Sequence, residues 1–244
     1  KYLLELFIIR GHSGPETAED SRTHFGIFAP GVTQLFPKGH IINIHPWEHN
    51  DVAPALAAAF STDVPIVALH LTRPAIEIPD REKLGMASHF DASKGAYLIR
   101  DYDDRPHDGV VIVRGTSSTN TVVSILEQIG SKYNVKIVSA ISWELFDMQT
   151  SEYKSSIIGD KEWADSMVIT NTGLNVMKNW ISNRVVADYS LSPDWDNRWR
   201  TGGSLEQIID EAHLSSRWVM EAIDKFSNDR NKRLERLKQE IPDN

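Results

Sequence analysis

Ionisable side chains are concentrated in the stretch from Gly11 to Gly26. It contains His12 and His24 with three acids between them, and Asp20 is one of the three. An imidazole titrates near neutral pH and can donate a hydrogen bond to a sugar hydroxyl or a phosphate, whereas a carboxylate accepts from a hydroxyl. The spacing of His12, Asp20 and His24 permits these side chains to converge but does not require it.

Arg73 follows a second apolar run, as the His12 stretch follows the first. The runs 3–9 and 66–71 are short and almost continuously apolar, which predicts buried strands. Ligands of open α/β sheets bind at the carboxyl ends of the strands, so we expect both segments to face one crevice. Arginine binds phosphate through two parallel hydrogen bonds. The residues indicate a pocket for a hydroxylated, phosphorylated small molecule, with a purely structural role as the alternative.

Strand and helix patterns alternate along the rest of the chain. A third apolar run at 41–44 and a helix at 51–60 complete a βαβ arrangement with the two strands above, which predicts a parallel sheet covered by helices. The pattern after residue 108 predicts a second unit of the same kind. Its expected strands are 110–113, 135–138, 167–170 and 185–187, and its expected helices are 119–129 (ended by Gly130), 174–180, 205–211 and 214–238.

Composition limits the class of protein. The chain has 244 residues, a formal net charge of -8 and no cysteine. The charge argues against nucleic acid as a partner, and the lack of cysteine excludes disulfides, thiolate catalysis and Cys-based zinc sites. No apolar stretch is long enough for a membrane span and no signal peptide is evident, so we expect a cytoplasmic protein. Because the chain begins with Lys1 inside a strand pattern, we also expect a preceding segment.

Three further motifs could have a functional or a structural role. The segment His45–His49 matches the zinc pattern H-x-x-E-H, but Pro46 disfavours the helix that the pattern needs. Gly115–Ser118 could bind an anion at a helix N-terminus or form a structural turn. The segment Trp195–Trp199 could be an interface, a lid or ordinary packing.

The first loop, Arg73 and the later segment Trp143–Gln149 together resemble the C-terminal half of a transketolase. In that family a His opens the loop, and an acidic pair and a second His follow in a Gly-Glu-Asp-Gly-Pro-Thr-His motif. His12 matches the first His, the pair Glu19–Asp20 matches the acids, and His24 matches the second His. Arg73 matches the arginine of a Ser-Arg pair that closes the next strand.

The resemblance implies a role for each matched residue. His12 and Arg73 would hold the sugar phosphate, Asp20 would bind a hydroxyl near the reacting carbons, and His24 would contact substrate at the catalytic position. The chain departs from the family pattern at Ser21–Arg22, which replaces Gly-Pro, so the substrate preference of this loop is an open question.

The resemblance also implies a fold and an organisation. We expect an α/β fold of two consecutive three-layer domains with mostly parallel sheets. Residues 1–75 would be the C-terminal part of a pyrimidine-binding domain of the thiamine type, residues 76–108 an interdomain linker with one short strand at 97–99, and residues 109–244 the transketolase C-terminal domain.

The function implied is that of a C-terminal part or subunit of a transketolase-like transferase. Such an enzyme transfers a two-carbon ketol unit between sugar phosphates with thiamine diphosphate and Mg²⁺ or Ca²⁺, which residues outside this chain would bind for the most part. No Gly-Asp-Gly metal motif occurs here. The N-terminal half or subunit would be a partner, in a homodimer or a heterotetramer. The alternatives are a non-catalytic dimerisation or regulatory domain of the same fold and the β-type component of a 2-oxo acid dehydrogenase.

Overall fold

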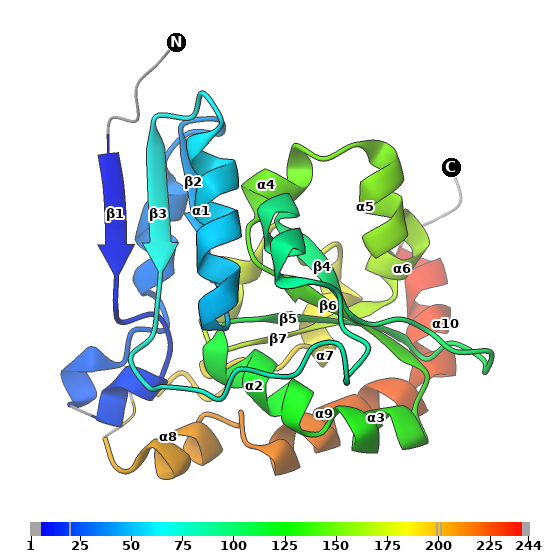
Figure 1. Cartoon of the computed structure of the whole chain (residues 1–244). Helices are drawn as coiled ribbons and strands as arrows, with labels where there is room; N and C mark the ends of the chain where they lie inside the picture. The colour runs from blue at the N-terminus through cyan, green and yellow to red at the C-terminus, as the bar shows by residue number, and fades with distance from the viewer. Residues whose placement is uncertain (1–5, 20, 199, 201, 241–244) are drawn as a thin grey trace.

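The computed structural model describes residues 6–19, 21–198, 200 and 202–240. They form two sheets with helices packed around them (Figure 1). The first sheet uses residues from the first third of the chain, and the second sheet follows it in sequence.

Three parallel strands make up the first sheet. Their order is β1 (Leu6–Arg10), β3 (Ile66–His70), β2 (Ile41–Ile44). Val67 at the centre of β3 is in register with Phe7 on one side and Ile42 on the other. Helix α1 (Val52–Phe60) connects β2 to β3, so the predicted βαβ arrangement is confirmed.

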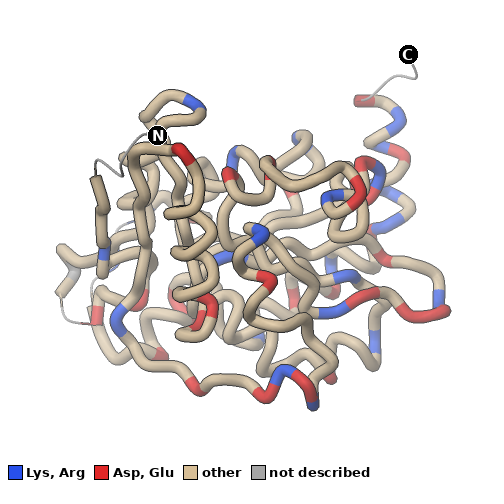
Figure 2. The backbone as a smooth tube through the Cα atoms, turned by 45° about the horizontal axis from the view of Figure 1, so that its top comes forward, with Lys and Arg blue, Asp and Glu red and all other residues tan. Residues whose placement is uncertain are grey.

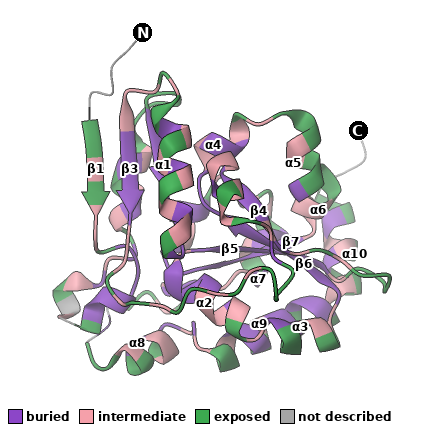
Figure 3. Cartoon of the chain, in the orientation of Figure 1, coloured by how far each residue is buried: buried purple, intermediate pink, exposed green. Residues whose placement is uncertain are grey.

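Strand β1 lies at the edge of this sheet and is largely exposed. Leu6 is 46% exposed and Ile9 62%, whereas Val67 on β3 is fully buried. Figure 3 shows the same contrast between β1 and the interior strands. Parallel sheets are normally covered on both faces, so this strand presents an apolar surface without the usual cover.

The second sheet has four strands. Their order is β4 (Ala96–Arg100), β6 (Val135–Ala140), β5 (Gly109–Arg114), β7 (Ser166–Thr170). Strand β4 runs antiparallel to β6, and the other pairs are parallel. All residues of β5, β6 and β7 are buried, as expected for parallel strands covered on both faces.

Successive residues of β5 pack on opposite faces of the second sheet. Val111 and Val113 join a core that includes residues of α2, α3 and α9, whereas Val110 and Ile112 join a core that includes residues of α4, α5 and α7. The expected α/β fold with mostly parallel sheets is confirmed. The helices of this part are α2 (Thr116–Ser124), α3 (Leu126–Lys132), α4 (Trp143–Asp147), α5 (Ser151–Ile157), α6 (Asp160–Ala164), α7 (Arg184–Tyr189), α8 (Leu205–Glu211), α9 (Ser216–Asn228) and α10 (Arg230–Glu240).

The strand predicted at 185–187 is wrong, because these residues lie in helix α7. The side chain of Asn183 accepts a hydrogen bond from the backbone N–H of Val186 and so caps the helix N-terminus. This cap and the burial of Val185 and Val186 outweigh the preference of β-branched residues for strands.

Three helix boundaries also differ from the prediction. Gly130 does not end a helix: it lies inside α3, and the break falls at Ile125 between α2 and α3. The long C-terminal helix is divided at Asp229, whose carboxylate accepts from the hydroxyl of Tyr189. The helix expected at 174–180 is a short 3₁₀ helix, Leu174–Met177.

The segment expected to be a linker is packed against the first unit. Arg81 donates to Glu48 at 2.7 Å, to Asp51 at 2.8 Å and to the hydroxyl of Tyr97 at 3.0 Å. The side chains of Glu48 and Asp51 are fully buried. Arg81 therefore neutralises two acids that have no access to water, and Tyr97 extends the contact to strand β4.

Replacing Arg81 with methionine is expected to lower the free energy of unfolding by about 3 kcal/mol, because it leaves two buried carboxylates without their cation. Urea unfolding at pH 7 measures this. Lys83→Met, at an exposed neighbouring position, is the matched control and should change the stability little. Equal stability of the two variants would contradict the role assigned to Arg81.

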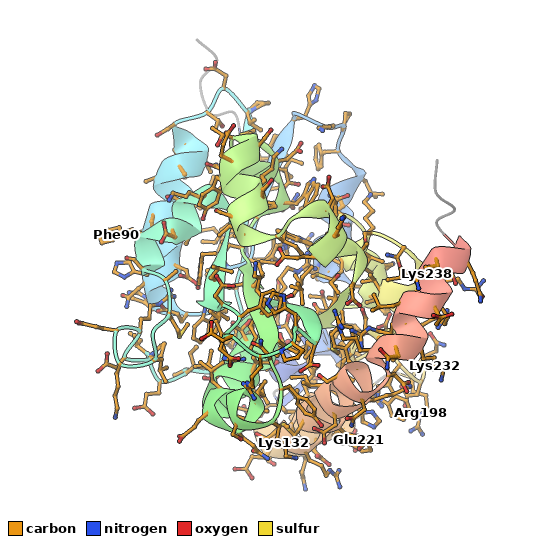
Figure 4. All side chains as sticks on the ribbon, turned by 90° about the vertical axis from the view of Figure 1, so that its right-hand side faces the viewer. Phe90, Lys132, Arg198, Glu221, Lys232 and Lys238 are labelled. Atoms are coloured by element: carbon orange, nitrogen blue, oxygen red, sulfur yellow. The ribbon has the colours of Figure 1, made fainter. Side chains whose placement is uncertain are left out.

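The surface of the C-terminal helix is strongly charged. Figure 2 shows basic and acidic residues close together along α10. Lys232 and Lys238 project outward from this helix (Figure 4). Among the described residues, no helix combines the length and the apolar character needed to span a bilayer.

Candidate functional site

The loop that follows β1 lies at the carboxyl end of the first sheet. Its backbone closes on itself through a hydrogen bond from Gly26 N–H to the Gly14 carbonyl at 3.2 Å. It is fixed to the segment after β3 by the N–H of Ser13, which donates to the Leu71 carbonyl at 3.0 Å. The loop and the segment that carries Arg73 therefore meet at one edge of the sheet, as the sequence predicts (Figure 1).

His12 and His24 lie side by side within this loop. Their ring centroids are 4.7 Å apart, with the planes tilted by 58°. The His24 carbonyl accepts a hydrogen bond from the hydroxyl of Thr17, which fixes the backbone at that position. His12 is an exposed residue.

Arg73 belongs to the same group of side chains. Leu71, two residues before Arg73, accepts from the N–H of Ser13, the residue next to His12. Desolvation lowers the pKa of His12, and the neighbouring His24 and Arg73 add to this effect. The structure thus brings together three of the four residues singled out from the sequence. The fourth, Asp20, lies outside the described residues.

The second unit holds this loop through a buried carboxylate. Glu16 is only 2% exposed. Its Oε1 accepts from the backbone N–H of Ser117 and from the side-chain amide of Asn171, both at 2.9 Å. Burial raises the pKa of Glu16. The turn at Gly115–Ser118, considered above as an anion site, is thus the N-terminus of α2, and it receives an anion from the protein itself.

An apolar contact supports the same loop from another side. Ala18, Phe25 and Ile27 form a small buried cluster with Ile208 of helix α8. In Figure 1 α8 lies beside the loop. Polar and apolar contacts from the second unit therefore both fix the segment between His12 and His24. The sequence analysis missed Glu16, Asn171 and Ile208.

The H-x-x-E-H segment forms an elbow between β2 and α1. The ring of His45 stacks on His70 with centroids 4.4 Å apart. Glu48 accepts from the N–H of Asn50 at 2.7 Å and binds Arg81, so its carboxylate is engaged in structural contacts. Within the described part of the chain, no group of three or more His, Cys, Asp or Glu residues could hold a metal ion.

The segment Trp143–Gln149 joins the two units at strand β2, which lies on the opposite side of the first sheet from β1. Glu144 of α4 accepts from the backbone N–H of Asn43 at 3.2 Å and from its side-chain amide at 3.1 Å. Both residues line a cavity of about 390 Å³, together with Gly39 and Ile41 at the start of β2. This cavity is separate from the His12 loop.

Trp195, at the start of the tryptophan segment, is half exposed and packs on neighbouring rings. It stacks on His213 with centroids 3.9 Å apart, and His213 stacks on Trp218 at 3.7 Å. Trp199 lies outside the described residues. Ring packing therefore accounts for the position of Trp195, and its part in an interface or a lid stays a prediction.

Known proteins that resemble this chain are transketolases. Residues 95–187 match the family model described as the transketolase-like TK C-terminal domain. The chloroplastic transketolase of Craterostigma plantagineum is 29% identical over 152 residues, which cover 60% of this chain and 27% of that protein. The transketolase of Bacillus subtilis is 28% identical over 151 residues, which cover 60% and 21%. The chain thus spans about a quarter of the length of these relatives.

Solved structures of transketolases share the fold. The enzyme from Leishmania mexicana superposes with a TM-score of 0.72 at 16% identity, over 90% of this chain and 30% of that one. A structure described as a split gene transketolase, an inactive beta4 tetramer, superposes with a TM-score of 0.60 at 12% identity, over 92% of this chain and 67% of that one. Residues 95–187 are therefore a transketolase-like C-terminal domain, and the chain as a whole corresponds in fold to the C-terminal section of transketolases.

Proposed function

We propose that this chain is the C-terminal part or subunit of a transketolase-like enzyme that transfers a two-carbon ketol unit between sugar phosphates. The grouping of His12, His24 and Arg73 at the carboxyl edge of the first sheet is the observation that carries this proposal. A side chain set that binds phosphate and hydroxyl groups at such an edge fits a sugar phosphate.

Each of these side chains would make a different contact with the substrate. His12, exposed beside His24, would donate an N–H to the phosphate. Arg73 supplies the positive charge and two parallel donors. His24 lies against His12, on the side of the loop where the sugar would extend, and Asp20 of the same loop would accept from a sugar hydroxyl.

The described residues do not fit the cofactor's metal site, because none of them forms a group that could hold a metal ion. Thiamine diphosphate, which supplies the carbon nucleophile in transketolases, and its Mg²⁺ or Ca²⁺ would be bound mainly by residues outside this chain. The exposed edge of β1 is where we place the contact with that other half or subunit, since Leu6, Phe7 and Ile9 present apolar surface there.

The assay that tests this proposal uses the complete protein, with this chain joined to or mixed with its thiamine-binding half. We expect transfer of a ketol unit from a ketose phosphate to an aldose phosphate. Binding of thiamine diphosphate without any transfer, over a panel of ketose and aldose phosphates, would instead identify a non-catalytic domain of this fold. Activity on 2-oxo acids alone would identify a dehydrogenase component.

A further inference from the structure

The side chain of Glu16 extends from the loop to the second unit, where its carboxylate is buried and hydrogen-bonded. Its Oε1 accepts from Ser117 N–H and from the amide of Asn171, and it lies at the N-terminus of the nine-residue helix α2, where a negative charge is favoured. Oε2 has no hydrogen-bond partner among the described residues. Of the two carboxylate oxygens, Oε1 therefore makes the hydrogen bonds to the second unit.

This contact reaches the two histidines through their immediate neighbours. The amide of Asn171 that donates to Glu16 also donates, at 3.3 Å, to the carbonyl of Ser13, the residue next to His12. Thr17, the residue next to Glu16, donates its hydroxyl to the carbonyl of His24. One amide of the second unit thus bonds directly to the start of the segment that separates the rings, and it reaches His24 only through Glu16 and its neighbour Thr17.

Two glycines leave room for the contact. Gly14 and Gly115 have φ angles of 131° and 94°, in the region that favours glycine. A Cβ atom at Gly14 would overlap the Glu16 carboxylate, and a Cβ atom at Gly115 would overlap the amide of Asn171. The backbone on both sides is therefore shaped for the close approach of these two side chains.

We propose that Glu16, together with Asn171, is a positioning residue that sets the relative placement of His12 and His24 from the second unit. Its carboxylate is buried and bonded to the second unit, so Glu16 acts on the histidines through the loop backbone. The description of these histidines as a substrate site rests on the proposed function, but their placement by Glu16 can be tested without it.

The test uses NMR on this chain without substrate or cofactor, with the imidazole signals assigned from His12→Gln and His24→Gln. In the unsubstituted chain we expect nuclear Overhauser contacts between the two rings and a His12 pKa below the ordinary value of about 6.5. In Glu16→Ala and in Asn171→Ala we expect the contacts to be lost and His12 to titrate closer to that value. Unchanged contacts and an unchanged titration in both variants would overturn the proposal.

Two further variants separate positioning from a general loss of stability. Glu16→Gln removes the negative charge and replaces the oxygen that has no partner, but it keeps Oε1 as the acceptor, so it should retain the ring contacts. Glu48→Ala removes another buried carboxylate, far from this loop in sequence and bound to Arg81. It should lower the melting temperature at least as much as Glu16→Ala does and leave the His12 titration unchanged. A Glu48→Ala chain that also loses the ring contacts would overturn the proposal.

Activity of the assembled enzyme supplies a readout that is separate from these measurements. We expect Glu16→Ala to lower kcat/KM for the sugar phosphate about tenfold, and Glu16→Gln to lower it less. An assembled enzyme with no transferase activity would reject the proposed function. Ring contacts that depend on Glu16 would still establish its positioning role.

Discussion

Replacing Arg73 with alanine in the assembled enzyme is expected to raise KM for phosphorylated sugars by about two orders of magnitude. Two charge-assisted hydrogen bonds from a guanidinium to a phosphate are lost, and about 3 kcal/mol corresponds to a hundredfold change in binding. KM for the matching unphosphorylated sugars should change little. Steady-state kinetics with paired phosphorylated and unphosphorylated substrates measures this split.

The variant Arg73→Lys should have a smaller effect on KM than Arg73→Ala. It keeps the positive charge but loses the planar pair of donors, so KM should rise by about tenfold. Arg217, an exposed residue of α9, provides the remote control, and Arg217→Ala should leave both KM values unchanged. An equal rise of KM for both substrate types in Arg73→Ala would show that Arg73 does not bind the phosphate.

Acid is expected to destabilise the fold through the stacked pair His45 and His70. Burial lowers the pKa of His70 to about 3, and Arg114 and Arg10 add to the effect. Burial, Arg114 and His70 hold the pKa of His45 well below its usual range. In the unfolded chain both rings take up a proton below pH 6.5 or so, whereas in the folded chain they stay neutral.

The sign of the pH dependence follows from this difference. The contribution of the pair is complete above the unfolded pKa and declines as the pH falls toward about 3. Each ring contributes a slope of about 1.4 kcal/mol per pH unit in that window. Urea unfolding between pH 4.5 and 7.5 measures the slope, and His70→Gln should reduce it by about half. His40→Gln, at an exposed position, should leave it unchanged. A His70→Gln chain with the original slope would contradict the assignment.

The sequence predicts a strand or helix of this protein well where the residues of that segment alone determine it. Short, mostly apolar runs identify β2, β3, β5 and β6, because parallel strands covered on both faces are buried on both sides. The helix expected at 205–211 has the bounds of α8. The prediction of a strand at 185–187 was wrong because it used composition alone. The composition of this run favours a strand, but the cap at Asn183 begins a helix there.

The meeting of the His12 loop with the segment that carries Arg73 could also be predicted, since both follow strands that are neighbours in a parallel sheet. The link between Glu16 and Asn171 could not, because it joins residues separated by 155 positions and has no local pattern. The clue in the sequence was Gly14, two positions before Glu16, and Gly115, two positions before Ser117, which is the other donor to Glu16. A glycine shows that something approaches the backbone closely, but it does not identify the approaching residue.

The open edge of β1 affects how the isolated chain behaves in solution. An unpaired strand edge offers a row of backbone N–H and C=O groups to any other extended chain, and here apolar side chains flank that row. Two copies of the chain can therefore adhere through this edge wherever no other chain covers it. Aggregation of the isolated chain would then reflect contact through this edge rather than a defect in folding.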